Sequence, residues 1–229
     1  MDNKRLKPLL IKFRIRTHHY ELFEQAFTHP SLNLNAHHKT PDYQRLEYVG
    51  DSVLGACVAS LSYKLRNDLH EGHLTRLRSS LVDTNSLSKL ALSYNFDQFI
   101  KLGPSFTGSV KNSPKILEDV FEAFIGAVYL TFGFNYTYKL VSNIFKDKII
   151  NFNYEESIDY KSKLQELLQA DHHCDIEYRL LNRRGPTNNP SFKIGLFYDH
   201  VCLGTGIGGS KKKAEQAAAQ MALSKLAKR

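Results

Sequence analysis

The chain has 229 residues, of which 42% are hydrophobic and 24% are charged, so it can bury a globular core. No stretch reaches the roughly 18–20 consecutive apolar residues that span a bilayer, so a membrane-spanning helix is excluded and no membrane partner is expected. The 31 Lys and Arg residues outnumber the 23 Asp and Glu residues, and the net charge of +8 weakly favours a polyanionic partner.

Helical patterns dominate the chain from about Tyr20 to Ile150. The segment 46–65 is apolar on nearly every face, which predicts a buried helix, and Asn85 is suited to cap a later amphipathic one. Gly, Ser and Pro are dense in 103–114, which predicts a loop. No convincing strand alternation occurs, so this part is predicted to be all-α. The predicted helices include 46–65, 74–81, 87–92 and 116–132.

The pattern changes after Asn151. Apolar residues recur at helical spacing from Tyr160 to Leu168, and three stretches of period-two alternation follow. A turn-rich loop, 184–190, separates the first two stretches, and an alanine-rich face predicts a closing helix. The order α-β-β-β-α within about 70 residues predicts a small α+β module with its helices on one face of an antiparallel sheet.

Four carboxylates lie inside the two most apolar predicted helices. Glu47 and Asp51 are four residues apart, and Asp119 and Glu122 are three apart, so each pair shares a helix face. Burying unpartnered carboxylates is costly. Arg45 offers a cation to the first pair, whereas the apolar neighbours of the second pair leave no cation in reach. A divalent metal is the other explanation, and oxygen-only ligands favour Mg²⁺ or Mn²⁺ over zinc.

Three glycines inside the same predicted helices bear on this choice. A helix-interior glycine costs about 0.5–1 kcal/mol relative to alanine. Gly50, Gly55 and Gly126 would let two helix backbones approach, so that carboxylates from both could meet. Ordinary ion-paired or helix-end carboxylates on solvated faces remain the alternative to a metal site.

The motifs around these carboxylates resemble a known family. Residues 44–54 (QRLEYVGDSVL) resemble the signature of the ribonuclease III family. Residues 118–127 (EDVFEAFIGA) resemble the second acidic motif of the same family. Three shorter motifs, at 28–31 (THPS), 71–72 (EG) and 102–104 (LGP), fall in the expected order around them. The α-β-β-β-α tail resembles the double-stranded-RNA-binding domain of bacterial members.

The resemblance implies an all-α endonuclease domain at 1–152, a linker at 153–158 and a small α+β (α-β-β-β-α) double-stranded-RNA-binding domain at 159–229. It implies a homodimer that hydrolyses phosphodiesters of double-stranded RNA with Mg²⁺, or with Mn²⁺ as a substitute, and without a small-molecule cofactor. The products would carry 5′-phosphate and 3′-hydroxyl ends, and rRNA and mRNA precursors would be the substrates. A cytoplasmic location agrees with the cysteines, whose wide spacing argues against disulfides or a zinc site: Cys57, Cys174 and Cys202.

The resemblance also assigns roles in the first domain. The implied catalytic residues are Asp51 and Glu122, and the implied metal ligands are Glu47, Asp119 and Glu122. Tyr48, where phenylalanine is usual, would enter a socket on the second subunit; a core position within one subunit is the alternative. Gln44 stands where many members carry another glutamate and cannot supply an anion. His29 is expected to be a structural hydrogen-bonding residue rather than a catalytic base.

In the second domain, the residues implied to bind RNA are Gln165, Glu166, Asn188, Lys211, Lys212 and Lys213. The first two resemble residues that meet 2′-hydroxyls in one minor groove, and Asn188, where histidine is common, lies in a loop expected to enter a second groove. The lysines follow Gly208 and Gly209 at a helix start, where free N–H groups and the helix dipole attract phosphate. A solvated lysine face is the alternative. Such a domain recognises A-form shape over about 16 bp.

Two other functions compete with a nuclease. A catalytically inactive double-stranded-RNA-binding or ribosome-associated relative would be marked by the loss of acidic residues, and all four are present. A helical domain stabilised by a structural metal, with a tethered RNA module, would differ in lacking RNA cleavage. Lys111 and Lys115 are expected to be solvated loop lysines, with contact to phosphate as the alternative. Glu71 is interpreted either as part of the active-site region or as a surface residue at a helix start.

Overall fold

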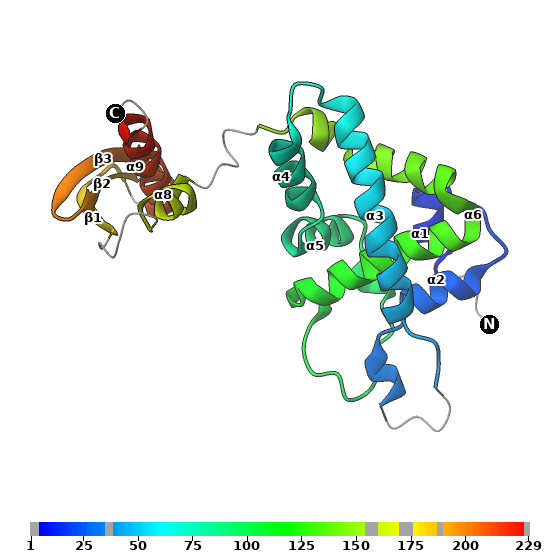
Figure 1. The fold of residues 1–229 in the computed structure, drawn as a ribbon. Coiled ribbons are helices and arrows are strands. Elements are labelled where there is room, and N and C mark those ends of the chain that lie inside the picture. Colours follow the sequence, from blue (N-terminus) through cyan, green and yellow to red (C-terminus); the bar gives the residue numbers. More distant parts are fainter. Residues whose placement is uncertain (1–4, 35–38, 154–159, 170–175, 187–189, 227–229) are drawn as a thin grey trace. The chain divides into compact units, whose positions relative to one another are not determined.

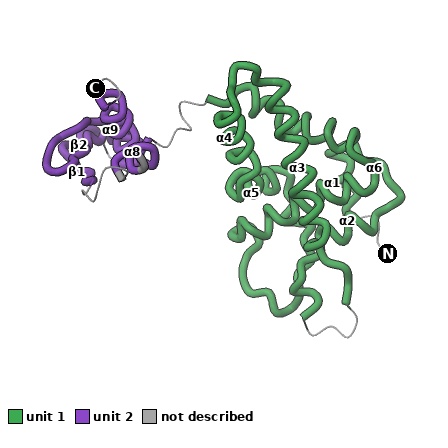
Figure 2. Tube along the Cα trace, viewed as in Figure 1, with its two compact units in different colours: residues 1–154 green, residues 155–229 purple. Residues whose placement is uncertain are grey.

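The computed structural model describes residues 5–34, 39–153, 160–169, 176–186 and 190–226 (Figure 1). The chain divides into two compact units, residues 1–154 and 155–229 (Figure 2). This division falls within the predicted linker 153–158, whose residues from 154 onward lie outside the described ones. The linker therefore stays a prediction.

The first unit is built from helices, as predicted. Its α-helices are α1 (Lys7–Lys12), α2 (Tyr20–Ala26), α3 (Gln44–Leu65), α4 (Glu71–Leu81), α5 (Thr84–Ser93) and α6 (Pro114–Ile150). Short 3-10 helices are η1 (Pro30–Asn33), η2 (Phe96–Phe99) and η3 (Val110–Asn112). Among the described residues of this unit, β pairing is limited to one bridge between Thr28 and Lys101. None of the described helices has the length and apolar character needed to cross a membrane.

All four helices predicted in the first unit begin two or three residues earlier than expected, at Gln44, Glu71, Thr84 and Pro114. The helix predicted over 116–132 begins at Pro114, because the fixed φ of proline suits the first helical turn. It continues to Ile150 past a break at Gly133, where φ is 75°. The cap of α5 is Asp83, whose side chain accepts a hydrogen bond from the Ser86 N–H at 2.7 Å, so the prediction of Asn85 was wrong.

The core of the first unit forms where α3 crosses α6 (Figure 1). A Cβ atom at Gly50 would lie 1.8 Å from the Glu122 carbonyl oxygen, and one at Gly126 would lie 2.3 Å from the Leu46 carbonyl oxygen. Only glycine fits at either position, so the predicted close approach of two backbones is confirmed there. Gly55 is different, because a Cβ there would meet nothing within 4 Å. Including Gly55 in that prediction was wrong.

The second unit has the predicted α-β-β-β-α order. It consists of α8 (Tyr160–Gln169), β1 (Ile176–Arg184), β2 (Ser191–Tyr198), β3 (Val201–Gly208) and α9 (Lys211–Leu226). The three strands form an antiparallel sheet in the order β1-β2-β3. Leu164 of α8 and Leu196 of β2 are fully buried against alanines of α9, so both helices cover one face of the sheet (Figure 1).

Glycines of β3 let α9 lie directly on the sheet. A Cβ atom at Gly206 would lie 2.2 Å from the Ala214 carbonyl oxygen, and one at Gly204 would lie 2.5 Å from that of Ala218. Two large side chains of β3, Val201 and Ile207, are exposed, whereas Leu203 is partly buried against the core of this unit. The alternation of β3 therefore identified the strand correctly, but its inner face is made by small residues.

Candidate functional site

Carboxylates from α3 and α6 meet at the crossing of the two helices. Glu47, Asp119 and Glu122 each offer one oxygen, and these three atoms lie within 4.8 Å of one another. Asp119 and Glu122 are buried, and Glu47 is half-buried. Asp51 lies one turn further along α3, exposed to solvent and outside this group of three oxygens. The structure thus brings together the three residues predicted as metal ligands.

Two charged residues of the cluster were missed by the sequence analysis. Glu118 is buried, and the Lys115 ammonium lies 3.2 Å from its Oε2, 2.7 Å from Asp119 Oδ1 and 4.0 Å from Glu47 Oε1. The second acidic pair therefore has a cation in reach, contrary to expectation, and Lys115 is not a free loop lysine. Arg45, the cation that was considered, forms no ion pair with the residues that the structure describes.

Helix register explains why Lys115 and Glu118 were overlooked. With α6 beginning at Pro114, Lys115 stands three and four residues before Glu118 and Asp119, the spacing at which helical side chains meet. Glu118 stands four residues before Glu122, so these two side chains also lie on the same face of α6. Starting the predicted helix at 116 removed Lys115 from that pattern.

The cluster fits a divalent cation. Among the described residues, Lys115 is the single cation that forms ion pairs with the cluster. Five carboxylates lie in or beside the cluster: Glu47, Asp51, Glu118, Asp119 and Glu122. The Lys115 ammonium, at 3.2 and 2.7 Å, contacts the buried oxygens Glu118 Oε2 and Asp119 Oδ1. One positive charge does not balance five carboxylates, and an ion with oxygen ligands would supply the missing charge.

Burial and the crowding of negative charge raise the pKa values of three groups at the cluster, Glu47, Glu122 and Tyr43. Burial, and then repulsion from Asp51 and Glu118, raise the pKa of Glu122 to about 8. Burial and the Asp119 charge also raise the pKa of Glu47. The Tyr43 hydroxyl donates to Asp119 Oδ2 at 3.2 Å, and burial and the neighbouring Asp119 charge raise the pKa of Tyr43, so it stays a donor. Without an ion, this raised pKa favours the protonated form of the Glu122 carboxyl at neutral pH.

We expect the melting temperature of the metal-free protein to fall as the pH rises from about 5 to about 8. The pKa of Glu122 is about 8 in the folded state and 4.5 without perturbation, so the folded state keeps a proton that the unfolded chain releases. The associated stability is complete below the unperturbed pKa and is lost as the pH rises through about 8. Melting curves in EDTA should show a smaller fall for Glu122→Gln than for the parent; equal falls would contradict this assignment.

Residues of the shorter motifs in the first unit form local hydrogen bonds and contacts between neighbouring loops. His29 Nδ1 accepts a hydrogen bond from the Ser31 N–H at 3.0 Å, and Ser31 Oγ accepts one from the Gly103 N–H at 2.9 Å. His29 is thus a structural hydrogen-bonding residue, as predicted. Glu71 lies in the first turn of α4, where its carboxylate accepts a hydrogen bond from the Thr75 hydroxyl at 3.1 Å.

Tyr48 lies beside the cluster on α3 but points out of the unit, with 79% of its surface exposed. Such exposure contradicts the alternative that Tyr48 fills a core position within its own subunit. A large exposed aromatic side chain next to an acidic cluster is available for contact with another molecule.

The residues implied to bind RNA occupy the surface of the second unit where they are described. Gln165 is exposed on α8, and Lys211, Lys212 and Lys213 are exposed in the first turn of α9. Ser210 Oγ accepts a hydrogen bond from the Lys213 N–H at 3.2 Å, which caps the helix. No ion pair joins the three lysines to a carboxylate among the described residues. Asn188 and the side chain of Glu166 lie outside the described part.

Comparisons with family models match both units. The model of a ribonuclease-III-like family matches residues 19–148, which contain the whole acidic cluster. The model of the double-stranded RNA binding motif matches residues 160–226.

Comparisons with individual proteins agree. Ribonuclease 3 of Latilactobacillus sakei is 38% identical over 99% of each chain, and that of Bacillus cereus is 41% identical over 90% of this chain and 85% of its own. A crystal structure of the ribonuclease III nuclease domain from Campylobacter jejuni covers 66% of this chain and 99% of its own, with 29% identity and a TM-score of 0.55. A second structure of that domain, described by flexibility in a region involved in dimer formation, covers 63% and 95%, with 30% identity and a TM-score of 0.52. The chain belongs to the ribonuclease III family of endoribonucleases and carries both the helical nuclease domain and the double-stranded RNA binding motif.

Proposed function

We propose that the protein is a Mg²⁺-dependent, double-strand-specific endoribonuclease that acts as a homodimer in the cytoplasm and processes rRNA and mRNA precursors. The observation that carries this proposal is the convergence of Glu47, Asp119 and Glu122 within 4.8 Å at the crossing of two helices. The double-stranded RNA binding motif at 160–226 supplies the substrate class. The expected products carry 5′-phosphate and 3′-hydroxyl ends.

The side chains of the cluster divide the work of hydrolysis. Glu47, Asp119 and Glu122 would hold the ion, which supplies Lewis-acid stabilisation of negative charge on the phosphoryl group. Tyr43 orients the Asp119 carboxylate by its hydrogen bond at 3.2 Å. Glu122 must release its proton before it can serve as a ligand, because its pKa is raised to about 8. Asp51, exposed one turn further along α3, would be the second catalytic carboxylate beside Glu122.

Long duplex RNA distinguishes this function from an inactive RNA-binding relative. The protein should cut such RNA into short duplexes in Mg²⁺ and leave it intact in EDTA, as sized on a denaturing gel. A duplex DNA of the same sequence is the matched control and should stay intact, because the binding module recognises A-form shape. Binding of duplex RNA without cleavage in Mg²⁺ would favour the inactive relative instead.

Changing Lys211, Lys212 and Lys213 together to alanine should weaken duplex RNA binding most at low salt. Removing each lysine–phosphate interaction should lower the slope of log affinity against log salt by about 0.7–0.9. Binding measured at several salt concentrations tests this, and cleavage should recover at saturating RNA. Lys225→Ala, an exposed lysine in the last turn of the same helix, is the control and should change the slope little. A triple variant with the parent's slope would mean that the lysines form only a solvated face.

Tyr48→Ala should shift the protein from dimer toward monomer and lower its activity. Tyrosine is enriched among the few interface residues whose truncation to alanine costs about 2 kcal/mol or more. Sedimentation velocity measures the shift. Tyr63, also on α3 and 72% exposed, provides the control, and Tyr63→Ala should stay dimeric. An unchanged dimer for Tyr48→Ala, or a monomeric parent protein, would refute the role.

A further inference from the structure

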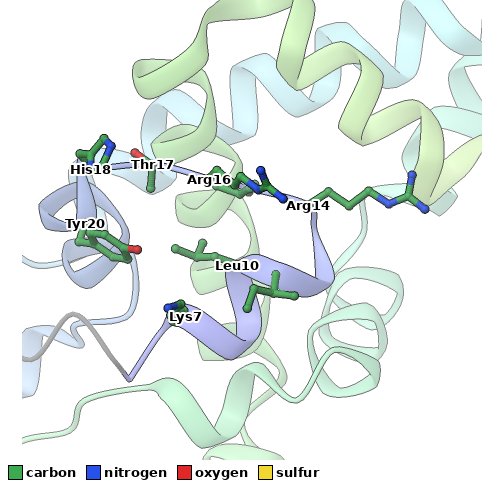
Figure 3. A pocket seen from close by; sticks show the side chains of 9 residues that line it. Lys7, Leu10, Arg14, Arg16, Thr17, His18 and Tyr20 are labelled. Carbon is green, nitrogen blue, oxygen red and sulfur yellow. The ribbon is translucent and has the colours of Figure 1, made fainter.

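A pocket of about 900 Å³ opens on the N-terminal part of the first unit (Figure 3). Its walls come from α1, the turn that follows α1 and the start of α2. None of the residues of the acidic cluster lines it. A volume of this size is in the range that holds small molecules, roughly 300–1,000 Å³.

The pocket wall is basic and lacks acidic residues. Lys7, Arg14, Arg16 and His18 line it, and no Asp or Glu does. Lys7, Arg14 and Arg16 form no ion pair with a carboxylate among the described residues. Glu24, by contrast, already pairs with two other cations. Cations around a cavity that no carboxylate balances give it a positive potential, which favours an anion.

An unusual turn builds this wall. Arg14 adopts a φ of 56°, the left-handed region that glycine normally occupies after a helix. The Ile15 N–H donates to the Leu10 carbonyl oxygen at 2.9 Å and the Arg14 N–H to that of Ile11 at 2.9 Å, which together form a Schellman motif. The Tyr136 hydroxyl donates to the Arg14 carbonyl oxygen at 3.3 Å. This turn reverses the chain and carries Arg16 back over α1 (Figure 3).

Apolar groups form the rest of the pocket. Leu10 and Ile15 are 2% and 4% exposed and supply a rigid floor. The Tyr20 ring points toward Leu10 across the opening, and Arg16 extends above Leu10 in the same view (Figure 3). A bare inorganic anion would leave these apolar surfaces unused. An anion joined to a flat ring would use both, because aromatic side chains stack on rings and guanidinium groups pair with phosphate.

We propose that this pocket binds a nucleotide, with its phosphates at Lys7 and Arg16 and its base against Tyr20. Two sources carry this chemistry: a free nucleoside diphosphate and the unpaired, 5′-phosphorylated end of an RNA strand. Arg14 points away from Tyr20 (Figure 3) and is assigned no contact. The site is separate from the nuclease function and needs no divalent metal.

Isothermal titration calorimetry of the full chain in EDTA tests the proposal. The probes are guanosine diphosphate, guanosine and a 5′-phosphorylated single-stranded pentanucleotide RNA. The parent should bind a phosphorylated probe at micromolar to millimolar concentration, and guanosine at least about tenfold more weakly. Tighter binding of the free diphosphate or of the RNA identifies the source.

Matched variants connect that binding to the pocket. Lys7→Ala and Arg16→Ala should each weaken the phosphorylated probe about tenfold or more, because charge-assisted hydrogen bonds to phosphate are removed. Lys12→Ala removes the same charge from the same helix outside the pocket wall and should bind like the parent. Glu122→Gln should also bind like the parent, which separates this site from the nuclease centre. Absence of binding for both phosphorylated probes, or equal weakening by Lys12→Ala and Arg16→Ala, would overturn the proposal.

Discussion

Replacing Glu122 with glutamine is expected to abolish RNA cleavage and to leave duplex RNA binding unchanged. The Glu122 carboxylate is buried within 4.8 Å of the Glu47 and Asp119 oxygens, so glutamine keeps its shape but removes an anionic ligand. Metal assistance is worth several kcal/mol of transition-state stabilisation, which predicts a loss on the order of a thousandfold or more. RNA binding should persist, because the lysines of α9 belong to the other unit.

Single-turnover cleavage of long duplex RNA at saturating Mg²⁺ measures this loss. Glu21→Gln, the same chemical change at an exposed site on α2, is the control and should cleave at the parent's rate. Near-normal cleavage by Glu122→Gln would remove Glu122 from the metal site. A loss of both cleavage and duplex binding would point to a folding defect instead.

Gly50→Ala is expected to destabilise the first unit by about 3 kcal/mol or more and to disrupt the acidic cluster. The added Cβ would lie 1.8 Å from the Glu122 carbonyl oxygen and 2.5 Å from its carbonyl carbon. Both are backbone atoms inside a buried helix, so no side chain can rotate away and α3 must separate from α6. Glu47 and Glu122 would then move apart together with their helices.

Gly55→Ala provides the control on the same helix. A Cβ at Gly55 meets nothing within 4 Å, so alanine should stabilise the helix by about 0.5–1 kcal/mol. Chemical denaturation measures both free energies of unfolding. Comparable stability of Gly50→Ala and the parent would show that the two helices do not pack as closely as described.

Periodicity was sufficient to predict the two folds, whereas the spacing of the carboxylates left a metal site and ordinary solvated carboxylates both open until the resemblance to ribonuclease III favoured the metal site. The apolar faces of α3 and α6 indicated buried helices, and the spacings of Glu47, Asp119 and Glu122 placed them on faces that could meet. The sequence could not tell which interior glycines touch a neighbouring helix, because Gly50 and Gly55 look alike until the crossing point is known. Helix ends were also missed by a few residues, and that shift concealed Lys115.

Long-range geometry limited the remaining predictions. The alternation of β3 located a strand, but its inward face is made by Gly204 and Gly206, because α9 approaches too closely for larger side chains. The N-terminal pocket depends on a left-handed turn at Arg14, where the absence of glycine gave no turn signal. The walls of the pocket come from two helices and the turn between them, and the periodicity of each helix does not predict how the two helices lie relative to one another.

The most direct test of the metal site is a crystal structure of the protein soaked with Mn²⁺, located by its anomalous scattering. The proposed site predicts an ion about 2.1 Å from carboxylate oxygens of Glu47, Asp119 and Glu122, the distance typical of Mg²⁺ sites. Lys115 should then have withdrawn from Asp119, because the ion replaces its positive charge. Two results would contradict the central claim that these carboxylates form the metal centre. One is an ion bound elsewhere, and the other is a cluster with no ion at saturating Mn²⁺, in which Lys115 is still the cation that contacts the carboxylates.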